Sequence, residues 1–127
     1  MPTILIVDDE PHIRRLIQQT LEALEDEGVD IITAQNGEEA LIIIKEKKPE
    51  LVLLDIMMPK MNGFVVCETV KKKLGMKDVY IAMLTAKGQA IDKADSIKSG
   101  CDDFITKPFS TKDLRTKARE ILFPVKK

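Results

Sequence analysis

Short apolar runs alternate with segments of helical periodicity along the whole chain. Uninterrupted apolar runs are typical of parallel strands that are buried on both faces of a sheet. The segments between the runs repeat apolar residues every three or four positions, which predicts amphipathic helices. The runs predict strands over residues 3–8, 30–34, 50–55, 79–85 and 102–107. The periodic segments predict helices from Pro11 to Gly28, from Asn36 to Pro49, around Val66 to Gly75, over about 88–99 and from Ser110 or Thr111 to Pro124.

This alternation predicts an α/β fold. Five strands that alternate with five helices favour a parallel sheet covered on both faces. Right-handed crossovers leave few ways to wind such a sheet, and one is the flavodoxin-like, doubly wound order 2-1-3-4-5. A chain of 127 residues is large enough to bury one core without disulfides, so residues 1–127 are expected to form a single domain.

Charged residues follow three of the predicted strands directly. Asp8 and Asp9 end the first strand, Asp55 ends the third and Lys107 ends the fifth. The carboxyl ends of parallel strands meet at one edge of the sheet, where open α/β folds bind ligands. In the order 2-1-3-4-5 the first and third strands are neighbours about 4.8 Å apart, so the three carboxylates should converge. Only a long side chain such as Lys107 would reach back to Asp55.

The chemistry of this predicted cluster favours a hard cation. Crowded carboxylates raise one another's pKa unless a cation lies among them. Oxygen ligands without histidine or cysteine select a hard ion such as Mg²⁺, which takes one or two carboxylates plus phosphate. Asp55 beside that ion and Lys107 is a reasonable covalent phosphoryl acceptor. Phosphoryl transfer needs positioning and charge neutralisation, to which Thr85 at the end of the fourth strand could add a hydrogen bond.

The composition of the chain mainly excludes classes of function. The net charge is −1 and the pI is about 5.9, so no global field recruits nucleic acid. The longest basic run, Lys71-Lys72-Lys73, is interpreted as the solvated face of a helix. No apolar stretch approaches the ~20 residues that cross a bilayer, and no leader segment precedes the first strand. Cys67 and Cys101 are not spaced like the ligands of a metal site. Together with the lack of a membrane-spanning stretch and of a leader signal, this favours a cytoplasmic protein with reduced thiols.

Four segments carry these residues: IVDDE (6–10), LLDIMMPKMNG (53–63), MLTAK (83–87) and GCDDFITKPF (100–109). In this order they resemble the response-regulator receiver domain of two-component signalling. The resemblance implies that Asp55 accepts a phosphoryl group from a sensor histidine kinase or a phosphotransfer protein. It implies that Asp9, Asp55 and the Met57 carbonyl hold Mg²⁺ directly, while Asp8 acts largely through a water.

The resemblance also implies a switch. Thr85, Ala86 and Lys107 would bind the phosphoryl oxygens, and Thr85 would move toward them once Asp55 is modified. Phe104 matches the family's aromatic switch residue, although it lacks the hydroxyl of the tyrosine found in many relatives. The output face would be the fourth predicted helix, the fifth strand and the fifth helix.

Partners are expected on two surfaces. Arg14, Arg15 and Gln18 point away from the apolar stripe of the first helix and, with Phe109, form a candidate kinase-docking patch; ordinary solvated positions are the alternative. The output face would meet a downstream protein or an output domain that this chain does not include, and a phosphorylation-dependent homodimer is left open. The chain would catalyse only its own phosphorylation and dephosphorylation, and would bind neither nucleic acid nor a membrane.

Three rival functions were weighed against this one. A magnesium-dependent phosphatase with an aspartyl nucleophile needs a second Asp two residues on as general acid, and residue 57 is Met. A flavin carrier would need a phosphate-binding loop after the first strand, where Asp8-Asp9-Glu10 would repel phosphate. A receiver that has lost its chemistry would lack one of the groups above, and each of them is present.

Overall fold

The computed structural model describes residues 2–58, 61–86, 98–107 and 109–124. Its five strands form one parallel sheet in the order β2-β1-β3-β4-β5, so the predicted 2-1-3-4-5 order is confirmed. The strand bounds agree with the apolar runs to within a residue or two. They are β1 (Thr3–Val7), β2 (Asp30–Ala34), β3 (Leu51–Asp55), β4 (Tyr80–Ala86) and β5 (Asp103–Lys107).

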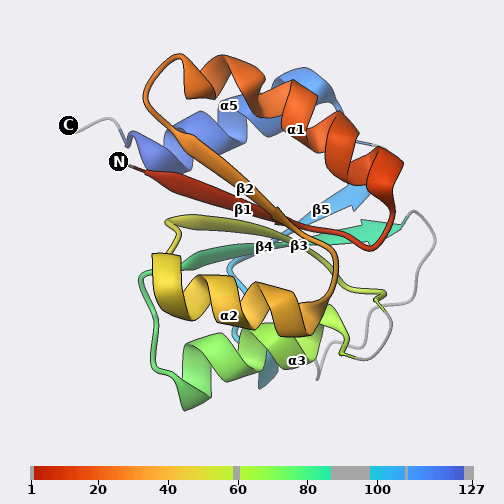
Figure 1. Ribbon diagram of the computed structural model, residues 1–127, viewed down its shortest axis with the longest axis vertical. Helices are drawn as coiled ribbons and strands as arrows, with labels where there is room; N and C mark the ends of the chain where they lie inside the picture. The colour runs from red at the N-terminus through yellow and green to blue at the C-terminus, as the bar shows by residue number, and fades with distance from the viewer. Residues whose placement is uncertain (1, 59–60, 87–97, 108, 125–127) are drawn as a thin grey trace.

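Helices cover both faces of the sheet. Figure 1 shows α1 and α5 against one face and α2 and α3 against the other. Within the described residues there are four α-helices rather than the five predicted. The fourth predicted helix, 88–99, lies mostly outside these residues, and only its last two positions are seen, in helical conformation. The helix bounds are α1 (Pro11–Glu25), α2 (Gly37–Lys47), α3 (Gly63–Glu68) and α5 (Thr111–Leu122), and a π-helical turn, η1 (Thr69–Lys73), continues α3.

The two faces of the sheet bury separate hydrophobic clusters. In β1, Leu5 and Val7 pack toward α2 and α3, whereas Ile4 and Ile6 pack toward α1 and α5. Every residue of β1 and β3 is buried. The central strands are therefore apolar on both sides, which is why they read as continuous runs and lack the alternation of a half-exposed strand.

Helix starts follow local side-chain chemistry. The Asn36 side chain accepts a hydrogen bond from the Glu39 amide at the start of α2, and Ser110 does the same for Asp113 in α5. Such N-caps satisfy amide groups that have no partner within the helix. The predicted starts at these two residues are confirmed.

The basic run Lys71-Lys72-Lys73 departs from the prediction of a solvated face. Lys71 is only 9% exposed, and its ammonium lies 2.7 Å from the carboxylate of Asp102. It also donates to the carbonyl oxygens of Val79 (2.5 Å) and Lys77 (3.3 Å). Lys72 and Lys73 are exposed as expected. The correction is specific to Lys71, which the π-helical turn directs toward the amino-terminal ends of β4 and β5.

Gly63 begins α3 and packs closely against the backbone at the end of β3. A Cβ atom at this position would lie 2.6 Å from the Asp55 carbonyl oxygen and 2.8 Å from Cε of Met83. The Gly63 amide donates to the Ile56 carbonyl at 2.9 Å. Close backbone approach therefore requires glycine here. This contact fixes α3 against the strand that carries Asp55.

Candidate functional site

Three carboxylates meet at the carboxyl edge of the sheet. β1 and β3 are paired neighbours, with Val7 opposite Leu54, so Asp8 and Asp55 follow on adjacent strands. Asp8, Asp9 and Asp55 each offer an oxygen within 4.8 Å of the others. Asp8 is fully buried, Asp55 is 6% exposed and Asp9 is exposed. The predicted convergence is therefore confirmed, and one of the three carboxylates faces the solvent.

The electrostatics of this cluster disfavour three negative charges. The pKa of Asp55 is raised from its ordinary 3.8 to about 7, chiefly by burial and also by the neighbouring charges of Asp8 and Asp9. The Lys107 ammonium and a hydrogen bond from the Met57 amide act in the opposite direction. A divalent cation would offset the remaining repulsion, because its positive charge favours the ionised carboxylate.

Lys107 reaches the cluster from β5, as predicted, but it pairs more closely with Asp8. Its Nζ atom lies 2.9 Å from Oδ2 of Asp8 and 3.8 Å from Oδ1 of Asp55. Burial by itself would lower the pKa of Lys107, yet the hydrogen bond to Asp8 and the charge of Asp55 give a net increase. Its ammonium is therefore charged at neutral pH and stands between the two buried carboxylates.

Three other predicted residues lie at the same edge. Thr85 is buried near the end of β4, and Ala86 ends that strand opposite Lys107 in the register. Met57 lies in the loop after β3, where its amide donates to Oδ1 of Asp55 at 3.2 Å and its side chain is 65% exposed. Each of the predicted phosphoryl-binding and metal-binding residues therefore lies either at the end of a strand or in the loop directly after one, at this edge of the sheet.

The donor set fits a hard cation. Asp8, Asp9 and Asp55 supply carboxylate oxygens, and no histidine or cysteine belongs to the group. Oxygen-only sites with open positions favour Mg²⁺, which keeps several waters. Asp9, the exposed member, is the one through which a hydrated ion could enter from solvent.

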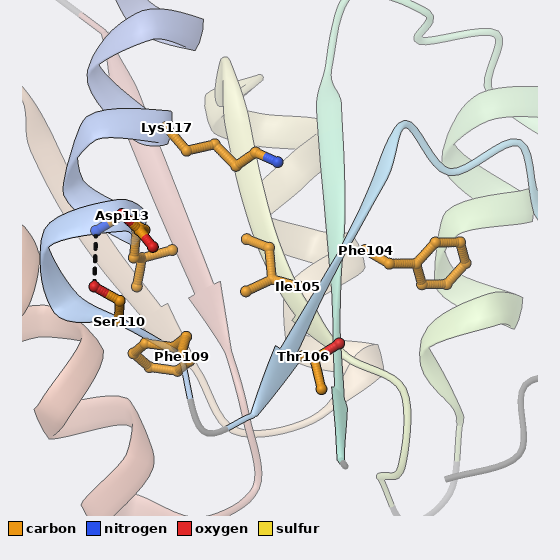
Figure 2. Close-up of a pocket in the computed structure, with 8 residues that line it drawn as sticks. Phe104, Ile105, Thr106, Phe109, Ser110, Asp113 and Lys117 are labelled. Carbon is orange, nitrogen blue, oxygen red and sulfur yellow. Dashed lines mark hydrogen bonds between the residues drawn. The ribbon is translucent and has the colours of Figure 1, made fainter. Parts of the chain in front are cut away.

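Phe104, one of the predicted switch residues, and Phe109, one of the predicted docking residues, lie on opposite sides of β5 (Figure 2). The Phe104 side chain points toward α3 and packs, half-buried, against the α2–α3 cluster. Ile105 and Phe109 line a groove of about 320 Å³ between β5 and α5. Arg15 and Gln18 are exposed on α1, whereas Arg14 is half-buried. Arg14 thus differs from the other members of the predicted docking patch.

Two contacts in the site were not predicted from the sequence. The Arg14 guanidinium donates to the Asp8 carbonyl at 2.7 Å, and the Glu10 amide donates to Oδ1 of Asp8 at 2.9 Å. The contact between the Glu10 amide and Asp8 could have been predicted from the sequence, because an Asp side chain often accepts a hydrogen bond from the amide two residues further along. The first joins residues six positions apart across a loop, and periodicity alone does not indicate it.

The fold and the site together define a class: a flavodoxin-like α/β domain with a cluster of three carboxylates and a lysine at the topological switch point. The family description "Response regulator receiver domain" matches residues 4–119. The chain therefore belongs to the response-regulator receiver family.

Relatives with solved structures share the whole fold. CheY4, a chemotaxis protein of Vibrio cholerae, is 30% identical with a TM-score of 0.81, covering 96% of this chain and 99% of its own. A CheY-like receiver domain protein from Methanospirillum hungatei JF-1 is 33% identical with a TM-score of 0.80, covering 95% of this chain and 94% of its own.

Curated relatives are longer proteins. "Probable transcriptional regulator ycf27" of Porphyra purpurea is 46% identical over 119 residues, which are 94% of this chain and 46% of the relative. "Alkaline phosphatase synthesis transcriptional regulatory protein PhoP" of Bacillus subtilis (strain 168) is 43% identical, over 94% of this chain and 48% of its own length. The chain spans about half the length of these relatives.

Within the described ranges, no helix combines the length and apolar composition that crossing a bilayer would need.

Proposed function

We propose that the chain is a phosphoacceptor switch, with Asp55 as the residue that receives the phosphoryl group. The observation that carries this proposal is the meeting of Asp8, Asp9 and Asp55 within 4.8 Å beside the Lys107 ammonium. The donor would be the phosphohistidine of a sensor kinase or a phosphotransfer protein. Its P–N bond breaks as a P–O bond forms to a carboxylate oxygen of Asp55, and the histidine leaves.

Mg²⁺ would be held by Asp9, Asp55 and the Met57 carbonyl, with Asp8 acting through a water, and would neutralise charge on the phosphoryl oxygens. Lys107 would leave its close contact with Asp8 to pair with a second oxygen. Thr85 and the backbone of Ala86 would hold the third. This division of work suits phosphoryl transfer, which depends mainly on positioning and charge stabilisation.

The transferred group would then bias a conformational equilibrium. A phosphoryl group adds nearly two negative charges at Asp55. Thr85 would move toward it, and Phe104 would follow into the space vacated. The affected surface includes β5 and α5, and the predicted helix over 88–99 would complete it. The two states differ in these contacts, which is the requirement for a population shift.

The wider role follows from the longer relatives. We infer a cytoplasmic signalling protein whose output goes to a downstream protein or to an output domain outside this sequence, with phosphorylation-dependent dimerisation as one mode. Two relatives are named as transcriptional regulators, which supports a role in gene regulation. This chain itself would turn over no external substrate, since the general acid of an aspartyl phosphatase is absent at Met57.

Intact mass spectrometry after incubation with a small acyl phosphate and Mg²⁺ tests the acceptor. The expected result is one phosphoryl adduct, which is lost in Asp55→Asn and when a chelator removes the ion. Asp78→Asn, an exposed carboxylate away from the site, is the matched control and should keep the adduct. An adduct that persists in Asp55→Asn would overturn the assignment.

The same assay separates the rival functions. A phosphatase would release inorganic phosphate from external phosphate esters with many turnovers, whereas a phosphoacceptor should leave such esters intact and carry at most one adduct per chain. A flavin carrier would bind flavin mononucleotide and quench its fluorescence. Turnover or flavin binding by the wild-type protein would replace the proposal.

A further inference from the structure

The loop between β1 and α1 is held by contacts on Asp8. The Asp8 amide donates to the Ala34 carbonyl at 3.3 Å, and its Oδ1 accepts from the Glu10 amide at 2.9 Å. Its Oδ2 pairs with Lys107 at 2.9 Å. The side chain of Glu10, the N-cap residue of α1, makes no capping hydrogen bond. The remaining polar atom of Asp8 is its carbonyl oxygen.

Arg14 binds that carbonyl oxygen. From the first turn of α1, its Nη1 atom donates to it at 2.7 Å, and the side chain is half-buried. The carbonyl belongs to the peptide group that leads into Asp9. Because this peptide plane is held, the directions in which the Asp9 side chain can point are restricted. Asp9 supplies the exposed carboxylate of the candidate cation site. Arg14 thereby ties the helix to the backbone between two candidate metal ligands.

We propose that Arg14 is a positioning residue of the cation site, which sets the orientation of the Asp8–Asp9 peptide group. This proposal rests on the proposed function and reassigns Arg14 from the kinase-docking patch. Groups that orient metal ligands without touching the ion affect affinity, and their loss typically weakens metal binding by about 10-fold to 100-fold. A guanidinium suits this role because its planar donors are held in a fixed geometry.

The neighbouring arginine supplies a matched control. Arg15 carries the same charge one residue further along α1, but it is exposed, and its side chain makes no hydrogen bond or ion pair with the described part of the chain. A docking role would depend on exposure and should favour Arg15. A positioning role depends on the contact with Asp8 and should be limited to Arg14.

The test measures Mg²⁺ affinity of the folded protein by isothermal titration calorimetry, without any kinase. Arg14→Met should weaken Mg²⁺ binding by about 10-fold, whereas Arg15→Met should leave it unchanged. Arg14→Lys keeps a long cationic side chain but loses the planar guanidinium group, so we expect an intermediate loss of Mg²⁺ affinity. If Arg14→Met fails to fold, the Mg²⁺ affinity of Arg14→Lys provides the test. Wild-type affinity in Arg14→Met, or in Arg14→Lys where the Met variant does not fold, would overturn the proposal.

A second readout separates positioning from general damage. The rate of phosphorylation by the small acyl phosphate should fall in Arg14→Met at low Mg²⁺ and recover when Mg²⁺ is saturating, because only the ion's affinity has changed. A rate that stays low at saturating Mg²⁺ would contradict the positioning role. If the wild-type chain binds Mg²⁺ but forms no adduct, the proposed function fails while the affinity comparison still decides the role of Arg14.

Discussion

Asp55 illustrates how one buried residue couples stability to function. Its carboxylate is almost fully buried beside two other acids, and its pKa is raised to about 7. The same crowding that makes the ionised form unfavourable in the empty site makes a cation and a phosphoryl group favourable partners. A residue of this kind lowers the stability of the free protein at neutral pH, which is common at functional sites.

The pH dependence of stability follows from this shift. Because the pKa of Asp55 is higher in the folded state than its ordinary 3.8, the folded protein binds the proton more tightly between about pH 4 and pH 7. Without divalent cations, the free energy of unfolding should therefore decrease as the pH rises through this range. The decrease attributable to Asp55 is at most about 4 kcal/mol, from about 1.4 kcal/mol per pKa unit.

Urea unfolding of wild-type and Asp55→Asn protein from pH 4 to pH 8 checks this expectation. The variant should lack this part of the decrease and should be the more stable protein at pH 8. Asp78→Asn reports the effect of removing an exposed carboxylate and should follow the wild-type curve. Parallel curves for wild-type and Asp55→Asn would show that Asp55 titrates normally.

At the scale of elements, Lys71 connects three parts of the chain. It projects from η1, pairs with Asp102 ahead of β5, and donates to carbonyls of Lys77 and Val79 ahead of β4. Asp102 in turn accepts a hydrogen bond from the Ile81 amide at 2.8 Å. This network closes the edge of the sheet opposite the acidic site. It fixes the start of β5, whose other end carries Lys107.

Removing the Lys71 ammonium should destabilise the fold. Lys71→Met keeps most of the side-chain volume but leaves Asp102 and two carbonyls without their donor. We expect a loss of about 1–3 kcal/mol in the free energy of unfolding, mainly because two carbonyl groups lose their donor, while Asp102 is partly exposed and keeps contact with water. Lys72→Met, at the exposed neighbour, should change stability by less than about 0.5 kcal/mol. Equal effects of the two variants in urea unfolding would show that the network contributes nothing.

The packing of α3 on β3 makes a second prediction at this scale. Alanine at Gly63 would place a methyl group 2.6 Å from the Asp55 carbonyl oxygen, which is backbone and cannot move aside freely. Gly63→Ala should therefore lower the free energy of unfolding by about 1–3 kcal/mol, as overpacking does. Thermal unfolding followed by circular dichroism measures this, and an unchanged midpoint would show that α3 shifts without cost.

At the scale of the whole molecule, the acidic site joins β1 and the centre strand β3 to Lys107 on the outer strand β5. Asp8 follows β1, Asp55 ends β3, and Lys107 ends β5, two strands beyond β3. A ligand bound there contacts elements distant in sequence, and this arrangement exists only in the folded protein. Binding should therefore stabilise the entire domain.

Magnesium should raise the thermal unfolding midpoint. At 100 times its dissociation constant, a ligand that binds only the folded state adds about 2.7 kcal/mol to the free energy of unfolding. Asp9→Asn removes the exposed carboxylate and should reduce the shift at the same Mg²⁺ concentration. Sodium chloride at matched ionic strength controls for screening of the acidic cluster. Equal shifts with both salts would contradict specific binding of the ion.

The sequence by itself determined the fold class and the meeting of three carboxylates at one edge of the sheet. Strands such as 3–8 and 50–55 are recognisable because burial on both faces demands continuous apolar residues, and the helix starts at Asn36 and Ser110 depend on local hydrogen bonds. Asp8, Asp9 and Asp55 could be brought together because strand order and strand ends are implied by the same pattern.

Only the tertiary structure decided where the long cationic side chains go. Lys71 looked like part of a solvated run and Arg14 like part of a surface patch, yet they bind Asp102 and the Asp8 carbonyl. Lys107 reaches Asp55 as predicted, and only its closer contact with the Asp8 carboxylate was not indicated by the sequence. Lys and Arg side chains span several ångströms and their partners lie on other elements, so packing between elements chooses among partners that local sequence leaves equivalent.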